Sequence, residues 1–169
     1  MPKSHDAPGT QLLRLWQRLA PLPGGRWLFS RAVGRQAPYT GSIGAVAQEL
    51  SPGYSRWTLR DRRRVRNHLR SVHAVALANL AEVASGTAML AGLAPGTRGI
   101  VRSLSIEYLK KARGTLTAEC RCSPPAVDRE TDYTVTATIA DAAGDIVASA
   151  SVVWRLAPAH PTPAPQAPK

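Results

Sequence analysis

A stretch from Ala74 to Gly92 restricts the possible folds of this chain more than any other feature of its sequence. Its residues are apolar or small almost all the way round a helix, which is typical of a helix enclosed by other structure. Asn79 and Glu82 stand near its middle, and a carboxylate at that depth is costly in a bilayer, so we expect a buried helix and not a membrane span. A single helix of this kind needs a sheet curled around it.

Six segments around this helix have the pattern of strands. Two precede it and four follow it, and the four have apolar residues at every second position, which indicates strands with one buried face. In the first of these four, the alternating apolar residues are Ile100, Leu104, Ile106 and Tyr108. The predicted strands are Thr40–Leu50, Tyr54–Arg60, Gly99–Lys110, Thr115–Cys122, Asp132–Ala140 and Ile146–Arg155. We therefore predict an α+β domain with an antiparallel six-stranded sheet around the helix.

The two ends of the chain differ from this core. Residues 10–20 and 26–35 have apolar residues at helical spacing and are separated by proline and glycine, which predicts two short basic helices. We expect them to pack on the domain or on a partner subunit, and the alternative is that they lie on a membrane surface. Residues 157–169 contain five prolines and no core residues, and we expect them to be extended or disordered. The predicted division is an N-terminal helical extension over 1–37, a domain over 38–156 and a tail over 157–169.

Charge is distributed unevenly along the 169 residues, which carry a formal net charge of +11. Residues 1–113 contain 18 Lys and Arg against 5 Asp and Glu, which indicates a surface that meets anions such as phosphates. Only two cysteines are present, Cys120 and Cys122, which excludes a disulfide scaffold and a zinc site built from three or four thiolates. The chain starts without the pattern of a signal peptide, so the expected compartment is the cytoplasm.

The residues with the clearest chemical potential lie at the start and in the middle of the enclosed helix. Backbone N–H groups of its first turn, beginning near Ala74, have no intrahelical partner and can hold an oxygen that becomes negative. Further along, desolvation should raise the pKa of Glu82, which improves this carboxylate as a base. Gly86, one turn after Glu82, leaves room for something to approach the carboxylate.

Ordinary structural roles account for the same residues. Glu82 can serve as an ion-pair partner for one of the many arginines of the chain. Asn67 and His73, which precede the helix, can cap it or pack against it.

Residues 38–156 resemble the hotdog fold, and in particular the phenylacetate-type branch of the acyl-CoA thioesterases. The resemblance rests on the spacing Asn67-x5-His73-x8-Glu82 and on the segment from Ile106 to Gly114, which is similar to the strand-turn signature YL..A..G of that branch. It implies a curved six-stranded sheet wrapped around a long central helix, and a homodimer or a dimer of dimers with the active site between subunits. It also implies a reaction without a metal and without a cofactor other than the coenzyme A of the substrate.

The resemblance assigns catalytic roles to four residues. Asn67 would orient water or substrate, His73 would support the helix start, the N–H of Ala74 would polarise the thioester carbonyl, and Glu82 would act as base or nucleophile. The family usually has His-Gly-Gly where this chain has His73, Ala74 and Val75. The implied function is hydrolysis of an acyl-CoA or a related acyl thioester, and the alternative is a non-catalytic hotdog module that binds acyl thioesters or acts as a structural dimer.

Basic residues cluster before the helix and again near a predicted turn at residues 112–114. The candidates for binding the phosphates of coenzyme A are Arg64, Arg66, Lys110, Lys111 and Arg113. Guanidinium groups match phosphate oxygens in geometry, and a solvated basic surface is the alternative. Binding of nucleic acid is not expected, because only one aromatic residue is near the basic segment and no nucleic-acid motif is present.

Overall fold

The structure of this protein is a computed structural model, and it describes residues 8–159. Its elements follow each other as three short helices, two strands, a turn of 3-10 helix, one long helix and four strands. Their bounds are α1 (Pro8–Leu19), α2 (Gly25–Gln36), α3 (Pro38–Ser42), β1 (Val46–Ser51), β2 (Tyr54–Arg60), η1 (Arg63–Val65), α4 (Ala74–Gly92), β3 (Thr97–Tyr108), β4 (Thr115–Arg121), β5 (Thr131–Ala140) and β6 (Ile146–Pro158).

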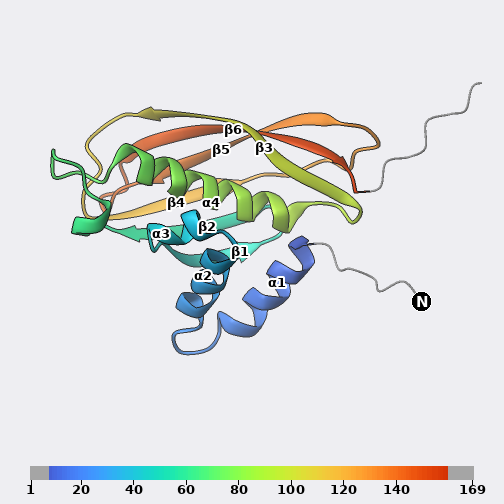
Figure 1. Ribbon diagram of the computed structural model, residues 1–169, viewed down its shortest axis with the longest axis horizontal. Coiled ribbons are helices and arrows are strands. Elements are labelled where there is room, and N and C mark those ends of the chain that lie inside the picture. The colour runs from blue at the N-terminus through green and yellow to red at the C-terminus, as the bar shows by residue number, and fades with distance from the viewer. Residues whose placement is uncertain (1–7, 160–169) are drawn as a thin grey trace, which may run out of the picture.

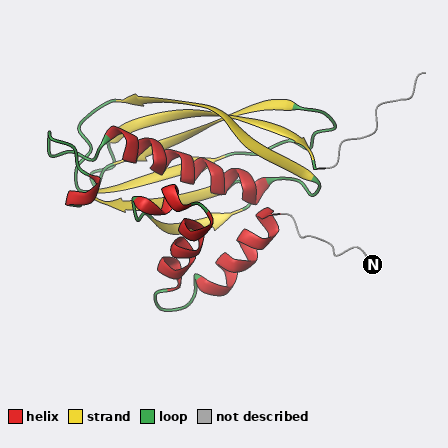
Figure 2. Ribbon diagram, viewed as in Figure 1, coloured by secondary structure: helices red, strands yellow, loops and turns green. Residues whose placement is uncertain are grey.

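The strands form one six-stranded antiparallel sheet in the order β1-β2-β4-β5-β6-β3. The sheet is curved, and α4 lies along its concave side (Figure 1). The shorter helices α1, α2 and α3 gather beside β1, so that helices and strands are separated into layers (Figure 2). The predicted α+β architecture, a six-stranded sheet wrapped around a long central helix with helices at the N-terminus, is confirmed.

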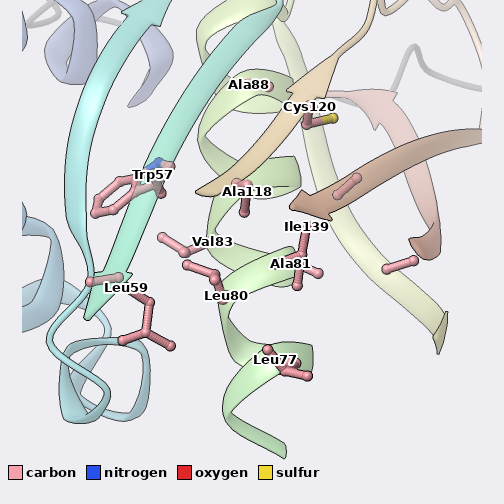
Figure 3. Packing of buried hydrophobic residues seen from close by; sticks show 14 of the residues in the cluster. Trp57, Leu59, Leu77, Leu80, Ala81, Val83, Ala88, Ala118, Cys120 and Ile139 are labelled. Carbon is pink, nitrogen blue, oxygen red and sulfur yellow. The ribbon is translucent and has the colours of Figure 1, made fainter. Parts of the chain in front are cut away.

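Small and aliphatic side chains of α4 form the centre of the core. Ala81, Ala84 and Ala88 are fully buried, which lets the strands approach the helix closely. Figure 3 shows Trp57 of β2 lying beside Val83 of the helix. By length and composition α4 could cross a membrane, but 67% of the apolar stretch is buried inside the structure, as expected of a core helix.

The two edges of the sheet differ in whether another element covers them. Beside β1, α2 covers the edge: the Oγ of Ser30 accepts a hydrogen bond from the N–H of Ala47 at 2.9 Å, and Arg26 donates to Gln48 at 3.2 Å. At the other edge, β3 pairs only with β6 within residues 8–159. An open edge strand offers backbone N–H and C=O groups to another chain.

The strand predicted over Thr40–Leu50 is wrong in its first half, where the chain forms α3 and then a turn. Pro38 occupies the first turn of α3, where its fixed φ suits a helix and its missing N–H is not needed. Gly41 of α3 packs directly against Gly34 of α2. A Cβ added to either glycine would lie 2.8 Å from the Cα of the other. This close contact holds α3, which contains Thr40, against α2.

The inward alternation predicted along β3 is wrong at Ile100, which is 69% exposed. A register shift between Val101 and Ser103 inserts one extra residue against β6, so Ile100 turns outward. Beyond the shift, Leu104 and Ile106 pack against the core as predicted, whereas Tyr108 at the strand end is 48% exposed.

At its C-terminal end β6 continues to Pro158, beyond the predicted strand end at Arg155. The remaining part of the predicted extended or disordered tail, residues 160–169, lies outside the described residues.

Candidate active site

The first turn of α4 is held by His73, whose Nδ1 accepts a hydrogen bond from the N–H of Val75 at 3.1 Å. The backbone N–H of His73 donates to the carbonyl of Val65 at 2.8 Å. Within residues 8–159, the N–H of Ala74 has no hydrogen-bond partner. The helix therefore begins with a capping side chain at His73 and an available backbone donor at Ala74.

Asn67 closes the loop that leads to this helix. Its Oδ1 accepts hydrogen bonds from the N–H of Leu69 at 2.9 Å and of Ser71 at 3.2 Å, and its own N–H donates to the carbonyl of Ser71 at 2.8 Å. Arg70 in the same loop has a φ of 53°, an unusual value for a residue other than glycine. The amide oxygen of Asn67 is thus engaged in the loop, and only its amide nitrogen is left for another partner.

Contacts join this loop to the turn between β3 and β4. The N–H of Val72 donates to the carbonyl of the buried Ala112 at 2.8 Å. The carboxylate of Asp61 accepts hydrogen bonds from Arg66 at 2.6 Å and from the N–H of Gly114 at 3.2 Å. The structure thus brings the loop of Asn67, the helix start and the second basic cluster together at one end of α4.

The five residues predicted to bind coenzyme A phosphates differ in their surroundings. Arg66 forms an ion pair with Asp61, and Lys110 forms ion pairs with Asp141 at 2.7 Å and Asp145 at 2.6 Å. The other three are exposed and form no ion pair with any residue between 8 and 159: Arg64, Lys111 and Arg113. Arg64, Arg66 and His73 also line a hollow of about 330 Å³ beside the first turn of α4.

Glu82 lies half-buried in the middle of α4. Burial raises the pKa of its carboxyl above the ordinary value of 4.5, and a hydrogen bond from the Thr40 hydroxyl opposes part of this rise. The alternative role of Glu82 as an ion-pair partner is not observed, since no Lys, Arg or His of residues 8–159 pairs with it. Its environment is that of a carboxylate that is poorly solvated and has no countercharge among the described residues.

Unsatisfied polar atoms flank this carboxylate. Asn79, one turn before Glu82, donates through Nδ2 to the carbonyl of Tyr39 at 2.9 Å, but its buried Oδ1 has no partner within residues 8–159. On the other side, a Cβ placed on Gly86 would lie 3.6 Å from the indole of Trp154 and 4.0 Å from Oε1 of Glu82. The buried Nε1 of Trp154 is likewise unpaired within the described part of the chain. Buried atoms of this kind normally have a water or a ligand as partner.

The N–H of Ala74 and the carboxylate of Glu82 lie far apart along α4. Glu82 follows Ala74 by eight positions. At 1.5 Å per residue, this places the two residues about 12 Å apart along the axis. One thioester carbonyl therefore cannot contact the Ala74 N–H and the Glu82 carboxylate of the same chain at once.

No group of three or more His, Cys, Asp and Glu side chains within residues 8–159 is arranged to hold a metal ion. Cys120 and Cys122, at the end of β4, are both free thiols.

A comparison with protein families identifies the chain. The profile of the family described as Domain of unknown function (DUF4442) matches residues 25–156, which is most of the chain. This protein belongs to the DUF4442 family. Among curated proteins, no match to it was found.

Solved structures show the same fold as this DUF4442 protein. A structural-genomics protein is 31% identical to it, with a TM-score of 0.75 over 89% of this chain and 98% of the other. A Pseudomonas aeruginosa protein, described as of unknown function and a probable thioesterase, is 22% identical, with a TM-score of 0.69 over 81% of this chain and 97% of the other. A Streptococcus mutans protein bound to acetyl CoA is 21% identical, with a TM-score of 0.58 over 66% of this chain and 87% of the other. These similarities confirm the predicted hotdog fold.

Two residues beside Glu82 were missed by sequence reasoning. Thr40 was assigned to a strand, although it lies on α3 and hydrogen-bonds Glu82. Trp154 was assigned only to the core, although its indole N–H is unpaired within residues 8–159. The partner of the Thr40 hydroxyl and the missing partner of the Trp154 indole N–H are recognisable only when the neighbours of both residues are known, so the sequence held no signal for either role.

Proposed function

We propose that this DUF4442 protein hydrolyses an acyl-CoA, or a related acyl thioester, to the free acid and a thiol. The observation that carries the proposal is the half-buried, uncompensated carboxylate of Glu82 on the enclosed helix of a hotdog fold. The available N–H of Ala74 at the positive end of the same helix adds a second component, a donor for the carbonyl oxygen. The Streptococcus mutans structure with bound acetyl CoA supports the choice of substrate class.

In this proposal, Glu82 either removes a proton from the attacking water or attacks the carbonyl carbon itself. In the second case the acyl-enzyme anhydride is then opened by water. In both routes, the C–S bond breaks, the thiolate leaves and takes up a proton, and the negative charge that develops on the carbonyl oxygen is stabilised by the N–H of Ala74. His73 keeps that N–H in place by capping the helix.

If Glu82 and the Ala74 N–H act on the same carbonyl, their separation of about 12 Å along α4 means that the two groups come from two copies of the chain. A second copy can bring its own helix start to the Glu82 of the first, and the open edge of β3 is the place where two sheets can join. We therefore propose a homodimer, or a dimer of dimers, with the active site between subunits.

We expect light scattering to give a particle of at least twice the 18.1 kDa chain mass. Replacing the exposed Ile100 of β3 with lysine should weaken the dimer, because a charge on an edge strand opposes pairing with another edge. Turnover should fall together with the dimer fraction. A stable 18.1 kDa monomer with full turnover would contradict both the dimer and the shared site.

A non-catalytic module that binds acyl thioesters is the second candidate. It is favoured by the helix start, where Ala74 and the 51% exposed Val75 stand in place of the two glycines usual in the thioesterases that the chain resembles. Their side chains narrow the approach of a thioester to the backbone.

Release of free thiol from a panel of acyl-CoAs distinguishes the two functions. The proposal expects at least one member to be hydrolysed at a rate proportional to protein concentration. Saturable binding of acyl-CoA without thiol release across the panel would instead establish the binding module.

A further inference from the structure

A pocket of about 530 Å³ lies between α2, α3 and the start of β1. Its volume is within the range of small-molecule sites. Apolar side chains from four different elements form part of its wall: Trp27, Val33, Val46, Trp57 and Val83. The wall also includes four arginines: Arg31, Arg35, Arg62 and Arg64.

The arginines at this pocket have no ion-pair partner within residues 8–159. No Asp or Glu occurs between residues 7 and 48, so neither α2 nor α3 contains an acidic residue. Arg31, Arg35 and Arg64 form no ion pair within residues 8–159, whereas Arg62 is engaged by the carbonyl of Ile43 at 2.7 Å. Like charges gathered around one cavity repel each other unless an anion enters it.

The pocket adjoins the candidate active site. Thr40 lines it and hydrogen-bonds the carboxylate of Glu82, and Val83 of α4 also lines it. Arg64 lines both this pocket and the smaller hollow beside His73. An anion held here would therefore lie beside Glu82, and Arg64 connects the pocket to the hollow at the helix start of the same chain.

We infer that this pocket binds an anionic group of the thioester substrate, a phosphate or a carboxylate, through Arg31, Arg35 and Arg64. The inference rests on the proposed function and specifies in addition that the thioester substrate carries a negative charge. Guanidinium groups bind both kinds of oxyanion through paired N–H donors. Two sources provide such a group: the phosphates of coenzyme A, or a carboxylate at the far end of the acyl chain.

The test compares Arg31→Ala and Arg35→Ala with Arg18→Ala. Arg18 is also an exposed arginine of the N-terminal helices, but it does not line the pocket, so its replacement removes the same charge elsewhere. Four substrates are used: butyryl-CoA, glutaryl-CoA and the N-acetylcysteamine thioesters of the same two acyl groups. Loss of a charge-assisted hydrogen bond should raise KM about 10-fold or more in each pocket variant.

The pattern over the four substrates identifies the source of the anion. If the pocket holds coenzyme A phosphates, KM rises for both CoA thioesters and for neither short thioester. If it holds the distal carboxylate, KM rises for both glutaryl thioesters and for neither butyryl thioester. Equal changes with all four substrates, or pocket variants that behave like Arg18→Ala, would overturn the inference.

Binding without turnover separates this inference from the proposed function. Calorimetric titration of the wild type and the three variants with coenzyme A and with glutarate measures the pocket directly. Absence of thiol release from every thioester overturns the hydrolase proposal, but a Kd raised about 10-fold in Arg31→Ala and Arg35→Ala alone still supports the anion site. Binding of neither probe by the wild type, or equal binding by all variants, overturns the anion site even where hydrolysis is observed.

Discussion

Replacing Glu82 with glutamine is expected to lower kcat by about 10²–10⁴-fold, the range for the loss of a positioned general base. The amide has nearly the volume of the carboxylate and can still accept the hydrogen bond from Thr40. It can neither accept a proton at neutral pH nor attack a carbonyl as an anion. Glu82 is the only acidic residue between Asp61 and Glu107, so no neighbour on α4 can replace it. Thiol release by the purified variant measures the effect.

The loss of activity in Glu82→Gln should not be accompanied by a loss of stability. The pKa of Glu82 is raised in the folded protein, so the stability that this group contributes is present below its unfolded pKa and is lost as pH rises through the folded pKa. At neutral pH the buried charge therefore opposes folding, and removing it should leave Tm unchanged or raise it. A lowered Tm with normal turnover would show that Glu82 has a structural role only.

The pH dependence gives a second measurement on the same residue. A base or nucleophile must be ionised, so kcat/KM of the wild type should fall on the acidic side with a midpoint above 4.5, the ordinary pKa of a glutamate. The residual kcat/KM of Glu82→Gln should not show this fall at acidic pH. As a matched control, Glu119→Gln removes a partly exposed carboxylate on β4 that lies 4.0 Å from Arg56, and it should change neither the rate nor its pH profile.

Much of the fold was predictable because its longest segments are strongly periodic. The bounds predicted for α4 and for β2 are those observed, since an apolar run with clear end signals or a strict alternation leaves little freedom. The short helix α3 was missed because Pro38–Ser42 is too short to show a period, and because its position depends on the Gly34–Gly41 contact with α2. Contacts between distant segments are not encoded in local spacing.

In the candidate site, too, local patterns were predictable from the sequence and contacts between distant segments were not. Glu82 and the helix start were recognisable from type and spacing, because an acid inside an apolar helix and a polar pair before it are local patterns. The place of Arg31 and Arg35 beside a pocket was not recognisable, because both arginines lie on an exposed side of α2. Only the packing of α2 against β1 and α3 turns that exposed side into one wall of a pocket.

Replacing Ala74 with proline should lower kcat by about 10²–10³-fold, the cost of removing one donor to a developing oxyanion. Proline removes the N–H and is well tolerated at the first position of a helix. The preceding residue, His73, has φ −66° and ψ 141°, a conformation that a following proline favours. Because the N–H of Ala74 has no partner within residues 8–159, the fold loses no hydrogen bond.

Ala74→Val is the matched control, because it adds bulk at the same place and keeps the N–H. Tm and the dimer should be similar in both variants, so a loss of turnover confined to Ala74→Pro assigns the oxyanion contact to this N–H and not to the space around it. Equal losses in both variants would indicate that the approach to the helix start is narrow. Full turnover in Ala74→Pro would place the donor elsewhere, because a hydrolase that uses this N–H cannot retain its rate without it.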